Sequence, residues 1–382
     1  MLKTISRRKF IKSSSAFGLF IILPASVLVK PGKAAPSDKL NIAAIGFGDK
    51  GAFNAKSMES ENIFAICDVD SRRVDTGLKT YPLAKGYSDY RKLFDEEKSI
   101  DAVMIATPDN SHAVITMAAL ERGKAVYCEK PLTHDVYEAR KVAQAAKKAG
   151  VATQMGNQGM ASEHMRIVRE MIEDGAIGDV REVIYWTDRP VWPQGMSKPK
   201  ESQEVPSNLD WDIWQGPAAD RPYHPSYLHF VWRGWQDFGT GAIGDMGGHL
   251  FGGLFYTLGL RPPEYVEGAS SDLCSGWRSV ANKDSYPRAS IVRWRFPATG
   301  TKPAIKLSWY DGGLKPERPE LLEDNRRLAE SGTFYIGDKG IIYNTRLLPE
   351  TKMKEYKMPE KKYPRSVGHY EEWLLAAKGQ GD

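Results

Sequence analysis

The stretch Leu40-Asn41-Ile42-Ala43-Ala44-Ile45-Gly46-Phe47-Gly48-Asp49-Lys50-Gly51 places a short apolar run directly before a glycine-rich turn. Such a run is typical of a buried strand. Gly46 allows a tight turn, Gly48 lets the backbone approach a pyrophosphate, and Gly51 allows a helix to pack closely on the strand. The free N–H groups and positive dipole end of that helix suit phosphates. A glycine turn without a nucleotide is the alternative.

The same pattern continues to about residue 154. Apolar runs recur at 63–67, 102–106 and 125–128, with helical patterns between them. Short apolar strands that alternate with helices predict a doubly wound parallel sheet, covered on both faces. Asp68 follows Gly46 by twenty-two positions, close to the spacing of about 20 expected for a carboxylate that binds the adenosine ribose. This carboxylate favours NAD, whereas Arg72 and Arg73 keep NADP open.

Two further strand ends carry polar residues at the edge where such sheets bind ligands. One is Thr107-Pro108-Asp109-Asn110-Ser111-His112, which is also typical of a turn followed by a helix cap. The other is Cys128-Glu129-Lys130-Pro131, which places an amine beside the cofactor unless Lys130 is a surface lysine in a turn. The predicted cofactor contacts are Gly46, Phe47, Gly48, Gly51, Asp68, Arg72, Thr107, Pro108, His112, Glu129 and Lys130.

With these motifs in order, the chain resembles the Gfo/Idh/MocA oxidoreductases. Gly244-Asp245-Met246-Gly247-Gly248-His249 supplies the Asp-x-x-x-His element that this family carries in its second domain. The resemblance covers about residues 39–378. It implies a Rossmann domain over 36–155, followed over 156–382 by an α+β substrate-binding and oligomerisation domain with an open, mostly antiparallel sheet. It also implies hydride transfer with sugars or cyclitols, and a homodimer or homotetramer.

The pattern of the second half agrees with such a domain. Residues 162–174 predict a helix that Gly175 stops, and polar residues alternate with apolar or aromatic ones at 180–186, 265–269, 289–296, 304–310, 333–336 and 340–343. Two departures from the family follow. Residues 250–254 are apolar or glycine where relatives usually have a polar residue. The chain also ends at Asp382, after a predicted helix over 370–378, where relatives usually continue with a segment that packs on the nucleotide domain; we expect a truncated C-terminus.

Hydride transfer from a secondary alcohol needs a group that takes the hydroxyl proton. Lys130 could do so in its neutral form, or it could stabilise the oxyanion as the ammonium. Asp245 and His249 are four residues apart and share a helix face. His249 is the predicted base or proton relay, and Asp245 is predicted to bind substrate hydroxyls or orient the ring. Metal binding and plain structural pairing are alternatives, but without a third ligand we predict no metal.

The segment between Trp186 and Trp235 is long, rich in proline and aromatic. Aromatic rings bind the C–H faces of sugars, so the composition suits a carbohydrate cleft. An aromatic loop packed on the sheet or on another subunit fits equally well. The predicted substrate contacts are Trp186, Tyr227, His229, Arg233 and Trp235.

The N-terminus contains Ser6-Arg7-Arg8-Lys9-Phe10-Ile11-Lys12, which predicts a twin-arginine export signal over residues 1–35. The apolar stretch 16–29 is shorter than the roughly twenty residues that span a membrane, so we expect no stable insertion. We expect the twin-arginine machinery to export a folded, cofactor-loaded protein to the periplasm. Removing the signal's seven Lys and Arg changes the formal charge from +5 to −2, which argues against nucleic acid as a partner.

Three cysteines make no disulfide framework and are expected to be buried.

Three functions compete at this point. The first is an NAD-dependent oxidoreductase that acts on a sugar, a sugar derivative or a cyclitol with a tightly bound cofactor, because a periplasm lacks a soluble nicotinamide pool. The second is a glycoside hydrolase or lyase that uses tightly bound NAD for transient C3 oxidation and elimination. The third is a carbohydrate-binding protein without catalysis, against which Lys130, Asp245 and His249 argue.

Overall fold

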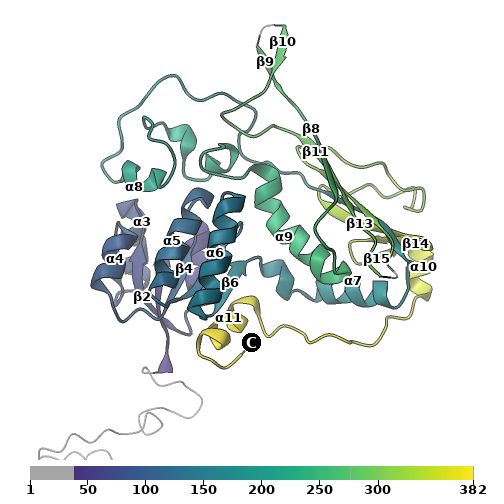
Figure 1. The fold of residues 1–382 in the computed structure, drawn as a ribbon, viewed down its shortest axis with the longest axis horizontal. Helices are drawn as coiled ribbons and strands as arrows, with labels where there is room; N and C mark the ends of the chain where they lie inside the picture. The colour runs from purple at the N-terminus through teal and green to yellow at the C-terminus, as the bar shows by residue number, and fades with distance from the viewer. Residues whose placement is uncertain (1–37, 276, 301, 382) are drawn as a thin grey trace, which may run out of the picture. The chain divides into compact units, whose positions relative to one another are not determined.

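The first sheet consists of six parallel strands in the order β3-β2-β1-β4-β5-β6. The structure is a computed structural model that describes residues 38–275, 277–300 and 302–381 (Figure 1). The strands are β1 (Asn41–Ile45), β2 (Asn62–Cys67), β3 (Lys85–Tyr87), β4 (Ala102–Ile105), β5 (Ala125–Glu129) and β6 (Thr153–Gly156). The intervening helices are α2 (Asp49–Ser57), α3 (Ser71–Thr80), α4 (Tyr90–Glu96), α5 (Asp109–Glu121) and α6 (Val136–Ala149). The strand order reverses between β1 and β4, where parallel sheets bind ligands at their carboxyl ends. The predicted doubly wound sheet is confirmed. The predicted signal lies outside the described residues.

The core of this domain consists of strands that are buried on both faces. Every residue of β4 and β5 is buried, as the continuous apolar runs in the sequence indicate. Cys67 and Cys128 are buried there as free thiols, as expected. Burial raises the pKa of the Cys67 thiol, which keeps it protonated and unreactive.

A second sheet of seven strands has the order β15-β14-β13-β7-β12-β11-β8. Its strands are β7 (Val180–Trp186), β8 (Tyr265–Ser270), β11 (Ser290–Phe296), β12 (Ile305–Tyr310), β13 (Gly332–Gly337), β14 (Gly340–Tyr343) and β15 (Arg346–Leu348). All neighbours are antiparallel except β7 and β12. The predicted mostly antiparallel sheet is therefore confirmed. A short hairpin, β9 (Leu273–Ser275) and β10 (Arg278–Val280), stands apart from it.

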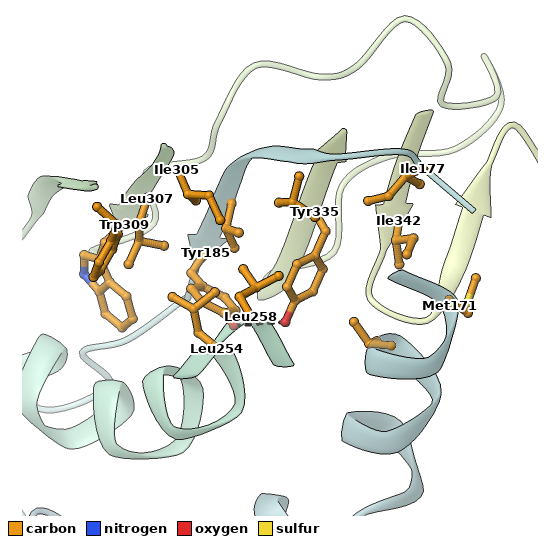
Figure 2. Packing of buried hydrophobic residues seen from close by; sticks show 14 of the residues in the cluster. Met171, Ile177, Tyr185, Leu254, Leu258, Ile305, Leu307, Trp309, Tyr335 and Ile342 are labelled. Atoms are coloured by element: carbon orange, nitrogen blue, oxygen red, sulfur yellow. Dashed lines mark hydrogen bonds between the residues drawn. The ribbon is translucent and has the colours of Figure 1, made fainter. Parts of the chain in front are cut away.

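Two helices cover one face of the second sheet. These are α7 (Glu163–Glu173) and α9 (Gly241–Leu258), which contribute Met171, Leu254 and Leu258 to the core. Figure 2 shows Leu254 and Leu258 against the strand residues Tyr185 and Tyr335, whose hydroxyls lie 3.2 Å apart. This core fixes α9, the helix that carries Asp245 and His249.

The opposite face of the second sheet is partly covered by the chain itself. Trp186, Phe334 and Leu348 pack there against Leu322, from the connection that precedes β13. Trp186 also donates a hydrogen bond from Nε1 to the Ala329 carbonyl, at 2.9 Å. Its aromatic surface is therefore taken up by packing within this layer.

Residues 206–240, called the crossing segment below, connect the second domain to the carboxyl edge of the first sheet. The segment contains α8 (Trp211–Gln215) and the short 3₁₀ turns Pro225–Tyr227 and Val231–Gly234. It encloses a small aromatic core of its own. The buried members are Leu209, Trp211, Trp214, Tyr223, Tyr227, Trp232, Trp235 and Phe238.

The last helix returns to the nucleotide domain. A 3₁₀ turn, Gln158–Ala161, follows β6, and the short helix α10 (Glu350–Glu355) follows β15. The last helix is α11 (His369–Ala377). Trp373 of α11 is buried with its ring centroid 5.7 Å from that of Tyr127 on β5. Helix α11 thus packs on the nucleotide domain. Among the described residues, no helix is long and apolar enough to cross a membrane.

Candidate active site

A cavity of about 670 Å³ lies along the carboxyl edge of the first sheet. Its lining comes from the glycine turn, from the ends of β2, β4 and β5, from α9, and from the crossing segment. Its volume is within the range of about 300–1,000 Å³ that is usual for small-molecule and cofactor sites. The cavity therefore joins the two halves of the chain at the place where the sequence predicts a cofactor.

The glycine turn needs glycine for steric reasons. Gly46 has φ +81°, and a Cβ there would lie 2.6 Å from the Ala106 carbonyl oxygen. A Cβ on Gly51 would collide with the carbonyl oxygen of Gly46. Gly48 is the N-cap of α2 and offers no side chain to its first N–H groups. The turn and the helix start thus form the cradle that a pyrophosphate would require.

Asp68 fixes the glycine turn to the end of β2. Its carboxylate accepts hydrogen bonds from the backbone N–H groups of Phe47, at 2.7 Å, and Asp70, at 2.9 Å. The Arg73 guanidinium lies 3.7 Å from this carboxylate and lines the cavity beside Gly48. Arg72 instead pairs with Asp70 at 2.7 Å and does not line the cavity. The predicted role of Arg72 is therefore corrected, because the helical rotation of α3 directs Arg73 to the turn.

His112 joins the two strand-end loops that the sequence indicates. Its Nδ1 lies 2.6 Å from the Pro131 carbonyl oxygen, and its Nε2 lies 2.9 Å from that of Thr107. Burial would lower the pKa of His112, but Cys128 and the two carbonyl oxygens raise it to about 9. A charged imidazole can donate to both oxygens at once. His112 therefore holds Thr107 and Pro131 together, while it also lines the cavity with Thr107 and Pro108.

Glu129 is held rigidly beside the glycine helix. Its Oε1 accepts hydrogen bonds from Asn54, at 2.9 Å, and Gln158, at 3.1 Å, and Lys50 lies 3.5 Å away. The carboxylate is buried, so these donors compensate for its lost water. Glu129 thereby fixes the backbone from which Lys130 projects.

Lys130 and Asp245 form an ion pair across the cavity wall. The ammonium lies 2.7 Å from Asp245 Oδ1 and donates a second bond to the Asp245 carbonyl oxygen, at 2.8 Å. Arg233 Nε reaches the same Oδ1 at 3.1 Å. Burial alone would raise the pKa of Asp245, but the charges of Lys130 and Arg233 lower it. The structure thus directs Asp245 to two cations and not to His249.

His249 lines the cavity one turn along α9 from Asp245. Burial, followed by the charge of Lys130, lowers the pKa of His249, so its imidazole is neutral at pH 7. Within the described part of the chain, the ring makes no hydrogen bond and is available to a ligand. No group of three His, Cys, Asp or Glu side chains suited to a metal ion occurs among the described residues.

Asp109 is a cavity residue that the sequence reasoning assigned only to a turn or a cap. Its Oδ2 accepts a hydrogen bond from the Thr240 hydroxyl, at 2.7 Å. Its Oδ1 has no partner among the described residues, although the side chain is buried. Burial raises the pKa of Asp109 to about 7, and the charge of Asp245 adds to the rise. Nothing local signals this environment, because Thr240 lies 131 positions away.

The predicted substrate contacts divide into two groups. His229 and Arg233 line the cavity. Tyr227 and Trp235 are buried in the aromatic core of the crossing segment, and Trp186 is buried on the second sheet, so none of the three lines the cavity. Their large rings favour close packing over exposure to a ligand. Phe230, which the sequence reasoning missed, lines the cavity and is 51% exposed.

A family model described as "Oxidoreductase family, NAD-binding Rossmann fold" matches residues 40–157, and its partner, "Oxidoreductase family, C-terminal alpha/beta domain", matches residues 166–283. Together they cover more than half of the chain. The myo-inositol 2-dehydrogenase of Thermotoga maritima is 29% identical over 36% of this chain and 42% of its own length. The inositol 2-dehydrogenase of Salmonella typhimurium is 30% identical over 32% of this chain and 37% of its own length.

The matched segment thus spans less than half of the length of these two relatives. Among solved structures, the WlbA dehydrogenase from Bordetella pertussis, in complex with NADH and UDP-GlcNAcA, has a TM-score of 0.59 at 16% identity. The alignment covers 90% of this chain and 89% of that one. At this identity the likeness shows a shared fold.

Proposed function

Because this chain belongs to the Gfo/Idh/MocA family of oxidoreductases and contains its NAD-binding domain, we propose that it is an NAD-dependent dehydrogenase of a sugar, a sugar derivative or a cyclitol. The observation that carries the proposal is the Lys130–Asp245 ion pair beside the neutral His249, at the cavity edge next to the glycine turn.

The residues of the cavity fit a dinucleotide. Gly46 and Gly48 would hold the pyrophosphate against the start of α2, which Gly51 allows to pack closely on the turn. Asp68 would accept the adenosine ribose hydroxyls. Arg73, beside Asp68, could bind the 2′-phosphate of NADP, so NADP is the alternative cofactor. When bound, NAD supplies hydride acceptance.

The chain's own groups divide the remaining chemistry. The Lys130 ammonium, oriented by Asp245, would donate a hydrogen bond to the substrate oxygen and stabilise negative charge that develops there. The neutral imidazole of His249 would accept the hydroxyl proton as the C–O bond becomes a carbonyl. Asp245 therefore positions Lys130 in this scheme. Arg233 and Phe230 would bind the remainder of the sugar.

The test begins with the purified folded protein. We expect denaturation to release a stoichiometric amount of NAD, and reduced-nicotinamide absorbance to rise when the correct sugar or cyclitol is added. Lys130→Met should lower turnover by about 10²-fold or more, since it removes a preorganised donor to the reacting oxygen. Lys141→Met, on the exposed surface of α6, is the matched control. Absence of nucleotide from the native protein, and failure to take any up, would reject the proposal.

Redox-assisted cleavage of glycosides is the second candidate function. Elimination needs an acid and a base in one site, and Asp109, with a pKa of about 7, faces the same cavity as the neutral His249. Cleavage of aryl glycosides by the purified protein without added NAD, and without accumulation of NADH, would select this function. A stable oxidised sugar would select the first.

The place of action and the assembly are also proposals. We propose export to the periplasm through the twin-arginine motif at residues 6–12, and a homodimer or homotetramer as family likeness suggests. Arg7→Lys with Arg8→Lys should leave the full-length protein in the cytoplasm on cell fractionation. Multi-angle light scattering would measure the oligomeric state, and a monomer would contradict the proposed homodimer or homotetramer.

A further inference from the structure

We propose that the crossing segment encloses the adenosine half of the bound dinucleotide and must detach from the first sheet before the cofactor leaves. This inference rests on the proposed function and extends it, because it assigns cofactor retention to a part of the second domain. Two sets of hydrogen bonds attach the segment to the first sheet.

The first attachment is a backbone bridge at the adenosine end. Asp70, which lies two positions after Asp68, forms an isolated antiparallel bridge with Leu209 of the crossing segment. The Ser71 N–H donates to the Asn208 carbonyl oxygen, and the Asp210 N–H donates to that of Val69, each at 2.9 Å. Backbone of the second domain is thus paired with the loop that would bind the adenosine ribose.

Side chains reinforce this bridge through Asp70. The Asn208 amide donates to Asp70 Oδ1 at 2.9 Å, and His229 Nε2 lies 3.3 Å from Asp70 Oδ2. Asp70 is 1% exposed and also caps the start of α3 through the Arg72 N–H. One buried carboxylate therefore gathers two residues of the crossing segment, 21 positions apart in the sequence.

The second attachment lies at the other end of the cavity. The Asn110 side chain donates to the Gln215 carbonyl oxygen, at 2.7 Å, and its N–H donates to that of Phe238, at 3.2 Å. His134, after β5, contacts the Gly239 carbonyl oxygen at 2.9 Å. The segment is therefore fixed at the ends of β2, β4 and β5, and it passes along the carboxyl edge of the sheet between them.

The crossing segment also contributes directly to the cavity wall. Its aromatic core, with Trp211 and Trp214 stacked at 4.9 Å, gives it a packed interior of its own. The cavity is thus lined by the nucleotide domain and by the crossing segment together. Beside the bridge, the cavity lining includes Asp68, Val69 and Arg73 of the nucleotide domain and His229 of the crossing segment, whose Nε2 contacts Asp70. A dinucleotide on the glycine turn would have the segment over its adenosine end.

The test uses Asn208, which joins the bridge but does not line the cavity. Asn208→Asp places a second carboxylate beside the buried Asp70, and the repulsion should detach the segment at that end. We expect NAD release, followed by displacement with excess labelled NAD, to become at least tenfold faster, with a smaller acceleration in Asn208→Ala. Asn62→Asp is the matched control, since Asn62 bonds to Asn41 at the opposite end of β2.

Hydrogen exchange gives a readout that does not depend on substitutions. In the native protein, bound NAD should slow amide exchange in residues 206–217 at least tenfold, relative to protein stripped of nucleotide. Release rates within twofold of native in both Asn208 variants, or unchanged exchange in residues 206–217 on NAD binding, would overturn the inference. Failure of the native protein to bind any NAD would instead reject the proposed function, so the two failures are distinguishable.

Discussion

At the scale of the residue, burial displaces two cavity groups from their usual protonation in opposite senses. It raises the pKa of the Asp109 carboxyl to about 7 and lowers that of the His249 imidazole, because each loses water around its charged form. Near neutral pH the cavity therefore contains a carboxylic acid that is close to half-protonated and an imidazole that is uncharged. These are the two groups whose titration should be measurable in activity and in stability.

The pH profile should report His249. If its neutral form accepts the substrate proton, kcat/KM rises with pH to a plateau, and the midpoint of the rise lies below the usual imidazole value of about 6.5. His249→Gln should lower kcat/KM by about 10²-fold or more and abolish this rise, while bound NAD is retained. A midpoint above 7 in the native protein would contradict the assignment.

Asp109 should appear in the pH dependence of stability. A carboxyl whose folded-state pKa is raised contributes stability that is complete below the unfolded value, near 3.8, and lost as pH rises through about 7. Asp109→Asn has no charge to bury, so its free energy of unfolding should improve relative to the native protein by on the order of 2–4 kcal/mol between pH 4 and pH 8. Urea unfolding at several pH values measures this, with the exposed Asp95→Asn as control. A difference that does not vary with pH would refute it.

At the scale of the element, α9 combines catalytic positioning with an unusual number of glycines. The helix contains six glycines in eighteen residues, although each glycine costs up to about 1 kcal/mol relative to alanine in a helix. The gain is close approach: a Cβ on Gly248 would lie 3.1 Å from the Lys130 Cβ, and one on Gly252 would lie 3.2 Å from the Asn157 amide. The glycines let α9 present Asp245 directly to Lys130.

Gly248→Ala should therefore separate activity from stability. The added methyl group should push Lys130 by a few tenths of an ångström and lower kcat by about tenfold, since small displacements of a positioned group are costly. The melting temperature should fall little, because alanine favours the helix. Gly268→Ala on β8, where a Cβ has no neighbour within 4 Å, is the control. Unchanged kcat in Gly248→Ala would show that the close approach has no catalytic consequence.

The elements that the sequence predicts are those with a clear local pattern. Strands β7 and β14 begin and end where the alternation of residues indicates, and α7 lies within one residue of its predicted ends at both sides. The short strand β3 was missed, because Lys85–Tyr87 has no apolar run of its own and depends on pairing with β2. The assignment of Arg72 in place of Arg73 has the same origin, since the helical phase of α3 is fixed by packing.

The aromatic side chains mark the limit of composition as a guide to function. A cluster of tryptophans and tyrosines suits both a sugar cleft and a small core, and only the tertiary contacts separate these. In the structure Tyr227 and Trp235 are core residues, while Phe230 is left half-exposed at the cavity. Asp109 was undetectable for a related reason, because its burial depends on Thr240 in the second domain.

At the scale of the whole molecule, α11 ties the C-terminal part of the chain to the nucleotide domain. The Tyr370 hydroxyl donates to Asn54 of the glycine helix at 2.7 Å, and Lys378 pairs with Glu61 at 2.5 Å. Trp373 is buried against Tyr127 of β5. The helix therefore contacts the same elements, α2 and β5, that position the glycine turn and Lys130.

Removing the largest of these contacts should weaken the whole protein. Trp373→Ala deletes a buried indole and should lower the free energy of unfolding by about 3–5 kcal/mol, as is typical of such cavities. Urea unfolding followed by circular dichroism measures this change. Trp277→Ala is the control, because Trp277 is fully exposed on the β9–β10 hairpin. A loss below about 1 kcal/mol for Trp373→Ala would show that α11 contributes little to stability.

The bonds that complete the cavity also have a consequence for the order of folding. They join residues that lie 105 to 138 positions apart: Asn110 to Gln215, Lys130 to Asp245, Asp109 to Thr240, and Asp70 to Asn208. Contacts between such distant residues form late, because a long loop must close first, and domains made early in synthesis fold before later ones. The first sheet can thus assemble while the segment that closes its cavity is still being synthesised. Retained cofactor would then mark a chain that has finished folding.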